Sequence, residues 1–316
     1  MPPFPKPETD YDYDLEEELK ALREHRNLRE IPEKTADRLL IATWNIANFG
    51  VQHRREKDIQ LLAEIIGWFD LVAVQEVARS LKHLDQLHEL LPDGYRRLIS
   101  DTGGNDERTA FLFDSEKVDQ LELVGRFAVP PADYRHINLD GVEQPFLGFD
   151  RTPYIAAFQA DAFRFTLASV HLFYGSEAAR DVERRALEAY AVARWADLSL
   201  DDEEAYARDV IALGDFNLPQ VKEGDPIFEA LTQRGLKLPP HPSVVGGTSL
   251  GGHKHYDQIA FFPGETEEFN QAIGVFDFDN CLFREHWNPA QPAPFLAYCR
   301  YYVSDHRPLW AEFKTG

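Results

Sequence analysis

The chain has 316 residues, of which 44% are hydrophobic and 12% aromatic, enough to fill the core of one large or two ordinary domains. Its 33 Lys and Arg residues face 54 Asp and Glu residues, and the formal charge of −21 repels polyanions at a distance, so any phosphate chemistry must be local. We expect a soluble, cytoplasmic protein, because no signal peptide or apolar run of roughly 18 residues is present. Cys281 and Cys299 allow at most one disulfide.

The first residues predict an arm that precedes the main body. Residues 1–13 are rich in Pro, Tyr and acidic side chains without periodicity, so they predict no regular structure. Asp14 can cap a helix over residues 15–28, whose thin Leu stripe predicts a mostly solvated helix packed on the body, with a docked arm or a dimer contact as the alternative. We therefore treat residues 1–37 as an acidic, Pro-rich arm with a helix and residues 38–316 as a single catalytic domain.

Beyond the arm, short apolar runs alternate with amphipathic segments, which is typical of a layered α/β domain. Strands are predicted near 39–44, 71–74, 109–113, 154–160, 165–170, 209–213, 256–262 and 309–313. Helices are predicted near 55–67, 81–91, 178–198 and 225–234. The runs 154–160 and 165–170 are too close for a helical crossover and must pair antiparallel. The sheets are therefore mixed, which argues against a doubly wound nucleotide-binding fold.

Polar side chains recur where the predicted strands begin or end. They are Asn45, Glu76, His171, Asp215 with Asn217, Asp257, and Asp305 with His306. One such junction is an ordinary turn, but six of them would form a rim of acids, amides and imidazoles, for which a site is the economical explanation. Carboxylates and amides suit Mg²⁺ or Mn²⁺, and no zinc-like spacing of Cys or His is present. Two imidazoles beside such a cation suit phosphate-ester hydrolysis.

Six stretches resemble, in order, the motifs of one known family. The stretches TWNI, VQEV, VHL, GDFN, YDQI and SDHRP span residues 43–308 and resemble the endonuclease/exonuclease/phosphatase superfamily of metal-dependent phosphoesterases, which includes deoxyribonuclease I. The resemblance implies a four-layer α/β sandwich, in which two packed mixed β-sheets are flanked by helices. It also implies a divalent cation, Mg²⁺ or Mn²⁺, as cofactor.

The resemblance assigns a metal centre and the groups that handle water. Glu76 would be the main metal carboxylate, with Asn45 beside it as ligand or orienter. Asp305 would be a further acid able to serve the metal. Asp215 would orient or deprotonate the attacking water, and Asn217 would hold water and phosphate.

The same resemblance implies two carboxylate–imidazole pairs. His306 would contact the scissile phosphate, and Asp257 would fix an imidazole by accepting its ring N–H. His171 would be the second catalytic histidine, as in the deoxyribonuclease I type, with Glu107 as its partner. Arg151, in an Arg-x-Pro segment, would reach the phosphate. Which imidazole is acid and which is base stays open.

The leading hypothesis is a metal-dependent phosphodiesterase of the nuclease type that cuts DNA or RNA. The alternatives are a hydrolase of a small phosphoester, such as an inositol phosphate or a phospholipid head group, and an inactive binding module. The basic runs REHRNLRE, HRREK and YRR are equally consistent with helix surface, and the loop with His253, Lys254 and His255 is either a cationic lip or a solvated turn. Trp44 is expected in the core. Gly214 is expected to let backbone and substrate approach, with Phe216 pointing into the core.

Overall fold

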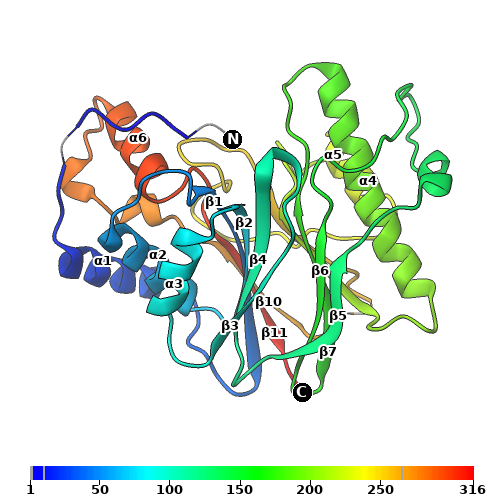
Figure 1. Cartoon of the computed structure of the whole chain (residues 1–316), viewed down its shortest axis with the longest axis horizontal. Helices are drawn as coiled ribbons and strands as arrows, with labels where there is room; N and C mark the ends of the chain where they lie inside the picture. The colour runs from blue at the N-terminus through cyan, green and yellow to red at the C-terminus, as the bar shows by residue number, and fades with distance from the viewer. Residues whose placement is uncertain (1–2, 10, 265) are drawn as a thin grey trace.

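Two packed β-sheets form the centre of the molecule. The computed structural model describes residues 3–9, 11–264 and 266–316. Figure 1 shows the two sheets side by side with helices on their outer faces. The four-layer α/β arrangement predicted from the sequence is confirmed.

Each sheet contains a single parallel pair within the described residues. The first sheet has six strands in the order β10 (Phe269–Val275), β11 (Leu309–Lys314), β1 (Arg38–Phe49), β2 (Leu71–Ala78), β4 (Glu107–Asp114) and β3 (Tyr95–Ile99). The second has five strands in the order β5 (Asp119–Arg126), β6 (Tyr154–Ala160), β7 (Phe163–His171), β8 (Asp209–Asp215) and β9 (Asp257–Ala260). β1 runs parallel to β2, and β7 runs parallel to β8. The hairpin predicted for residues 154–170 is the antiparallel pair β6–β7.

The helices divide between the outer faces of the two sheets (Figure 1). The first sheet is covered by α1 (Leu15–Leu28), α2 (Glu56–Gly67), α3 (Lys82–Leu90) and α6 (Pro292–Tyr302). The second is covered by α4 (Ala179–Asp201) and α5 (Pro226–Thr232). Short 3₁₀ segments lie at Gly104–Asp106, Pro131–His136, Phe278–Asn280 and Arg284–His286. None of the helices in the described part of the chain is long and apolar enough to cross a membrane.

The continuous apolar runs in the sequence are strands that are buried on both faces. Leu39 and Ile41 of β1 point into the core between the sheets, whereas Leu40, Ala42 and Trp44 point toward the helices. Successive side chains of a strand face opposite sides, so a central strand of a layered fold needs apolar residues at nearly every position. Trp44 is fully buried, as expected.

Three strands and one α-helix of the structure were not predicted from the sequence. β3, β5 and β10 are all at an edge of their sheet. Exposed or half-exposed residues interrupt the apolar pattern of these strands. An edge strand has a neighbouring strand on one side only, so more of its side chains remain in contact with solvent. The missed helix α6 begins in a Pro-rich stretch that also has the composition of a loop.

The helix of the arm is docked on the body rather than loosely attached. Its bounds match the predicted 15–28, and Asp14 accepts a hydrogen bond from the Glu17 amide as N-cap. Leu22 is fully buried in the core that α1 shares with the first sheet. His25 and Arg29 both bind the buried Asp277, with an Nε2–Oδ1 distance of 2.8 Å for His25.

The residues ahead of α1 contain no helix or strand where the structure describes them, and residues 1, 2 and 10 of the predicted unstructured segment lie outside the described residues. Cys281 and Cys299 are both buried and free, so the one disulfide that the composition allowed is not formed.

Candidate active site

The predicted site residues meet at the edge where both parallel strand pairs end. His171 on β7 lies opposite Asp215 on β8, and Asp215 lies opposite Asp257 on β9. In the first sheet, Asn45 on β1 lies opposite Gln75, the neighbour of Glu76 on β2. The carboxyl ends of parallel strands meet at one edge of a sheet, so each pair delivers its polar residues to the same place.

Asn45 and Glu76 do not terminate their strands, contrary to the expectation from the sequence. β1 continues to Phe49 and β2 to Ala78, and the pairing register shifts just after Asn45 and again between Val74 and Val77. Glu76 has a φ of 61° and Asn48 a φ of 50°. Bulges of this kind redirect a side chain while the ladder goes on, and positive φ at non-glycine residues is typical of functional sites.

Asn45 connects the two halves of the site. Its Nδ2 donates to Glu76 Oε1 and to Asp215 Oδ2, both at 3.0 Å. The second oxygen of Glu76 accepts the Asn48 amide at 2.8 Å. The second oxygen of Asp215 accepts the Asn217 amide at 2.8 Å. Both carboxylates are therefore held in fixed orientations by backbone and side-chain donors.

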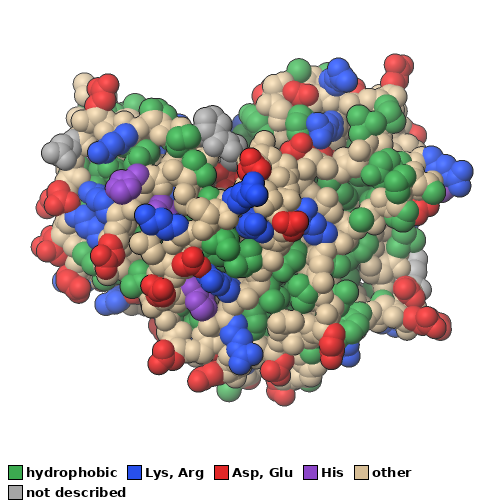
Figure 2. All heavy atoms as spheres, in the orientation of Figure 1, with side chains coloured by type: hydrophobic (Ala, Val, Ile, Leu, Met, Phe, Trp, Pro, Cys, Tyr) green, Lys and Arg blue, Asp and Glu red, His purple; other side chains and the backbone are tan. Residues whose placement is uncertain are grey.

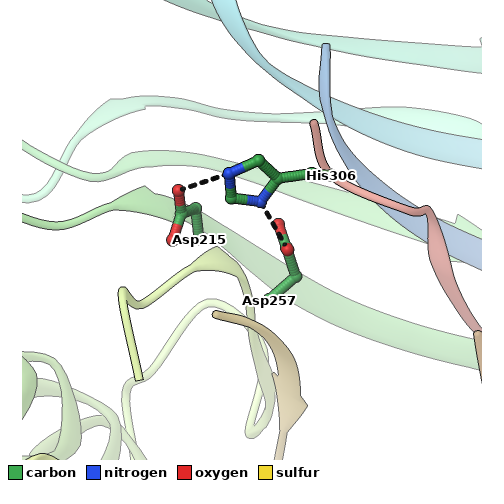
Figure 3. A group of neighbouring side chains, drawn as sticks. All are labelled: Asp215, Asp257 and His306. Carbon is green, nitrogen blue, oxygen red and sulfur yellow. Dashed lines mark hydrogen bonds and ion pairs between the residues drawn. The ribbon is translucent and has the colours of Figure 1, made fainter. Parts of the chain in front are cut away.

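The first imidazole pair consists of His306 and Asp257 (Figure 3). His306 Nδ1 lies 2.8 Å from Asp257 Oδ2, and its Nε2 lies 3.8 Å from Asp215 Oδ2. The His306 backbone is also held, because its carbonyl accepts the Trp44 indole N–H at 2.8 Å and its amide donates to Ser304 Oγ. A carboxylate on Nδ1 fixes the ring orientation and directs Nε2 toward Asp215.

The second pair, His171 with Glu107, mirrors the first. His171 Nδ1 lies 2.9 Å from Glu107 Oε2. Its Nε2 lies 3.6 Å from Asp215 Oδ2 and 3.9 Å from Glu76 Oε1. The Nε2 atoms of both imidazoles thus lie within 4 Å of the same carboxylate oxygen of Asp215.

Burial and charge act in opposite directions on these groups. Burial alone would lower the pKa of His306, but the charges of Asp257 and Asp215 outweigh it and hold that pKa well above its ordinary value. Burial would raise the pKa of Asp215, but the imidazoles His306 and His171 hold it below its usual range. The mutual attraction of these groups therefore favours the ionised form of Asp215 and the protonated form of His306.

The other carboxylates respond to their own surroundings. Burial, followed by the charge of Glu107, raises the pKa of Glu76. Burial, followed by the charge of Asp215, raises the pKa of Asp257. For Glu107 the contact with His171 outweighs burial and lowers the pKa. A bound cation would oppose the rise at Glu76, because a positive charge favours the ionised carboxylate.

Comparisons with known proteins agree with this arrangement. A curated deoxyribonuclease from Thioalkalivibrio sp. (strain K90mix) is 28% identical over 302 residues, which cover 90% of this chain and 73% of that protein. An endonuclease/exonuclease/phosphatase family protein from Bacteroides thetaiotaomicron has the same fold, with a TM-score of 0.57 at 19% identity over 88% of this chain and 95% of that one. A mannosyl-6-phosphatase from the same species has a TM-score of 0.53 at 18% identity, covering 86% and 98% of the two chains. A scan against models of protein families found no match.

The chain has the fold of the endonuclease/exonuclease/phosphatase superfamily, and a distant relative is a deoxyribonuclease. The shared fold, the distant deoxyribonuclease relative and the side chains at the strand ends agree on this assignment. These findings support a metal-dependent phosphoesterase of that superfamily.

The donor set at the strand ends fits a divalent cation. Asp215, Asp257 and His306 offer ligand atoms that all lie within 4.8 Å of one another, and all three are buried. Asn45 Oδ1 is buried and, among the residues that the structure describes, has no hydrogen-bond partner. The Nδ2 of the same Asn45 side chain donates to Glu76, so the amide oxygen of Asn45 lies close to the Glu76 carboxylate. Amide and carboxylate oxygens are ligands that hard cations prefer.

A cavity of about 710 Å³ opens over these groups in the superfamily fold. It is lined by Glu76, His171, Asp215, Asn217, Asp305 and His306 of the predicted set, and also by Arg151. Asp305 is partly exposed, with Oδ1 4.0 Å from His306 Nε2. Asn45, Glu107 and Asp257 are buried and contact Glu76, His171 and His306 of this lining, so the predicted set is brought together.

Arg151 and Asn217 are largely occupied by the protein itself. Arg151 Nε and Nη2 donate to the carbonyls of His171 and Leu172, and Nη1 lies 3.2 Å from Asp150. Its contact with phosphate stays a prediction, because these bonds already explain a buried Arg at this position. Asn217 Nδ2 donates to the Leu172 carbonyl. This bond leaves the Asn217 side-chain oxygen as the atom that could hold water.

Gly214 lies where two strands approach each other closely. Its φ is +130°, and a Cβ at this position would lie 2.1 Å from the Val170 carbonyl oxygen on β7. The glycine therefore allows the close approach of β7 and β8, and the approach of substrate to its backbone stays a prediction. Phe216 is fully buried, as predicted. The loop with His253, Lys254 and His255 does not contribute to the cavity lining described above, and Lys254 lies 3.8 Å from Glu177.

Several residues of the site were missed by the sequence analysis. Asn48 supplies the amide that orients Glu76, and Phe173, Tyr174, Tyr256 and Phe4 line the cavity. Phe173 and Tyr174 directly follow the VHL motif, and Tyr256 is the first residue of the YDQI motif, so their positions in or next to a motif could have indicated them. Phe4 carries no such signal, because it lies far from every motif in the sequence.

Proposed function

We propose that the protein is a member of the endonuclease/exonuclease/phosphatase superfamily and a divalent-metal-dependent phosphodiesterase of the nuclease type, which hydrolyses DNA or RNA with Mg²⁺ or Mn²⁺. The observation that carries the proposal is the symmetrical placement of two imidazole Nε2 atoms, 3.6 and 3.8 Å from Asp215 Oδ2, each imidazole backed by its own carboxylate. Hydrolysis of a phosphodiester requires that the attacking water lose a proton and that a poor leaving group gain one. Two positioned proton carriers suit that requirement. The similarity to a curated deoxyribonuclease supports the same choice.

In this mechanism Asp215 is the base and His306 is the cationic group on the phosphate. Asp215 accepts a proton from water as the water oxygen forms a bond to phosphorus. The bond from phosphorus to the leaving oxygen then breaks, and that oxygen takes a proton from a protonated imidazole. Asp257 keeps His306 oriented and charged through the 2.8 Å contact with Nδ1. A divalent cation held by Glu76 and Asn45 would neutralise phosphate charge.

The test is hydrolysis of matched substrates by the full chain. Supercoiled plasmid, linear DNA, single-stranded RNA and bis-p-nitrophenyl phosphate are each incubated with Mg²⁺, Mn²⁺ or EDTA. We expect metal-dependent cleavage of a polynucleotide that falls by roughly 10²- to 10⁴-fold in His306→Ala and Asp215→Ala. Glu203→Gln, a change on the exposed surface, is the control and retains wild-type rates. Undiminished activity in both site variants would refute the assignment.

A hydrolase of a small phosphoester is the second candidate. It is favoured by the acidic lining of the cavity, where Glu76, Asp150, Asp215 and Asp305 outnumber Arg151. The structural similarity to a mannosyl-6-phosphatase points the same way. Intact polynucleotides alongside His306-dependent hydrolysis of a small ester would support this candidate. An inactive binding module, the third alternative, predicts no metal-dependent turnover of any phosphoester.

A further inference from the structure

The N-terminal segment, residues 3–9, contributes to the wall of the catalytic cavity. Pro3, Phe4 and Pro5 line the same 710 Å³ cavity as the catalytic residues Asp215 and His306. In Figure 1 the dark blue chain runs past α6 toward the sheet edge at which the strands deliver these residues. A segment outside the six motifs is thus part of the site.

Specific contacts hold this segment in place. The Phe4 amide donates to Gln52 Oε1 at 2.9 Å, and Gln52, itself buried, donates from Nε2 to the Tyr301 carbonyl on α6 at 2.9 Å. The Arg300 guanidinium lies 5.3 Å from the centre of the Phe4 ring. The position of Phe4 is therefore fixed by the loop after β1 and by α6.

Further along, the same arm is anchored to the body by two tyrosines. The Tyr11 carbonyl accepts the Tyr298 hydroxyl at 2.9 Å, and the Tyr13 hydroxyl donates to the buried Asp58 at 2.7 Å. Tyr13 is itself buried in the core. Both contacts precede α1, so residues 3–9 are connected to the body through anchored residues only a few positions away.

Aromatic rings form much of the cavity wall besides Phe4. Phe173 and Tyr174 extend from the end of β7, and Tyr256 precedes β9. The Tyr256 ring centre lies 5.8 Å from that of His306 and 6.2 Å from that of Tyr174. Aromatic surface therefore reaches the immediate neighbourhood of His306, where an unpaired nucleobase would find stacking partners.

The charge around the cavity argues against recognition through the phosphate backbone. Among the described lining residues, Arg151 is the one Lys or Arg, and its nitrogens already bind carbonyls and Asp150. On the face drawn in Figure 2, Lys and Arg side chains are spread among acidic ones. Duplex binding without sequence preference draws its affinity from basic groups along the backbone, whereas single-strand binding also draws on stacking.

We propose that the cavity takes an unpaired nucleotide, whose base stacks in the aromatic wall that includes Phe4 of the N-terminal segment. The substrate class is then single-stranded or frayed nucleic acid rather than intact duplex. This inference rests on the proposed nuclease function. The cavity volume falls within the range of about 300 to 1,000 Å³ that is typical of sites for one small ligand, such as a nucleotide.

The test compares kcat/KM for a single-stranded oligonucleotide and for its duplex, with Mg²⁺, in full-length variants. The wild type cleaves the single strand at least about tenfold more efficiently. Phe4→Ala lowers kcat/KM for the single strand by roughly 5- to 150-fold, the range for one base stacked on one ring, mainly through KM. Phe4→Trp retains activity, because it keeps an aromatic face. Glu8→Ala, in the same segment but exposed and outside the cavity lining, matches the wild type.

Phe4→Leu separates stacking from simple packing, since it keeps an apolar side chain without an aromatic face. Wild-type efficiency in Phe4→Leu or Phe4→Ala overturns the inference, as does equal cleavage of duplex and single strand that still depends on His306. If no polynucleotide is cleaved while a small ester is hydrolysed, the proposed nuclease function itself fails. Thermal unfolding of each variant shows that the fold is intact.

Discussion

Glu188 on α4 gives the sharpest prediction of pH-dependent stability. Its carboxylate is fully buried; Oε2 accepts the Phe173 amide at 2.9 Å and Oε1 the Asp150 amide at 3.1 Å. Arg184 Nε lies 3.7 Å away. Burial raises the pKa of Glu188 from 4.5 to about 7, because these contacts compensate only part of the lost hydration.

The sign follows from proton linkage. Between pH 4.5 and about 7 the folded state holds a proton on Glu188 that the unfolded state has released, so the free energy of unfolding falls as pH rises. The full stability is present below pH 4.5 and is lost through about pH 7. The difference between the two pKa values corresponds to roughly 3 kcal/mol.

Glu188→Gln removes this titration, because the amide is neutral at every pH. Its NH₂ group must face one of the two backbone N–H donors, so the variant loses a hydrogen bond at all pH values, which costs about 1 to 3 kcal/mol. Urea unfolding from pH 4 to 8 measures both chains. We expect the stability of the wild type relative to Glu188→Gln to fall by roughly 3 kcal/mol over this range. Glu203→Gln on the surface should show no such trend. A constant difference between wild type and Glu188→Gln would refute the reasoning.

Three further changes test other parts of the structure. Asp279 binds Arg307 through two buried contacts of 2.7 Å, so Asp279→Ala leaves the buried guanidinium without its partner. We expect the free energy of unfolding in urea to fall by about 3 to 5 kcal/mol, and a fall of less than about 1 kcal/mol would contradict this. Gly214→Ala places a Cβ 2.1 Å from the Val170 carbonyl oxygen at a φ of +130°. We expect the free energy of unfolding to fall by more than about 3 kcal/mol, measured by thermal unfolding. An unchanged Tm would show that the strands can separate. Mg²⁺ at about 100 times its Kd should raise the free energy of unfolding of the wild type by about 2.7 kcal/mol, and EDTA should reverse this effect. Glu76→Ala should be stabilised far less. Equal stabilisation of both proteins would exclude Glu76 as a ligand.

The elements that could be predicted are those whose signals are local. The helix 15–28 has Asp14 as a side-chain cap, and the helix after Asp225 has Pro at its first position and an Asp that accepts two backbone amides. Central strands are buried on both faces and show as apolar runs. His171 and Asp215 follow such runs directly, so their meeting at one edge was foreseeable.

The elements that could not be predicted depend on tertiary contacts. The edge strands β3, β5 and β10 are held by one neighbour each and lack a continuous apolar pattern. The bulges that carry Glu76 and Asn48 past the expected strand ends need the neighbouring strands to maintain their positive φ values. Phe4 reaches the cavity only because Gln52 and α6 hold it there.

The placement of the site follows from strand direction. Within the described residues, β1–β2 and β7–β8 are the parallel pairs of the two sheets, and every other pairing is antiparallel. An antiparallel pair sends its ends to opposite edges, whereas a parallel pair brings two carboxyl ends together, and here the two parallel pairs face each other across the core. Asn45, which hydrogen-bonds to Glu76 in its own sheet and to Asp215 in the other, spans the gap between them. Asn45→Ala should therefore weaken the coupling between Glu76, the proposed metal ligand, and Asp215, the proposed base. We expect metal affinity and activity to fall together, whereas loss of one without the other would show that the two halves of the site act independently.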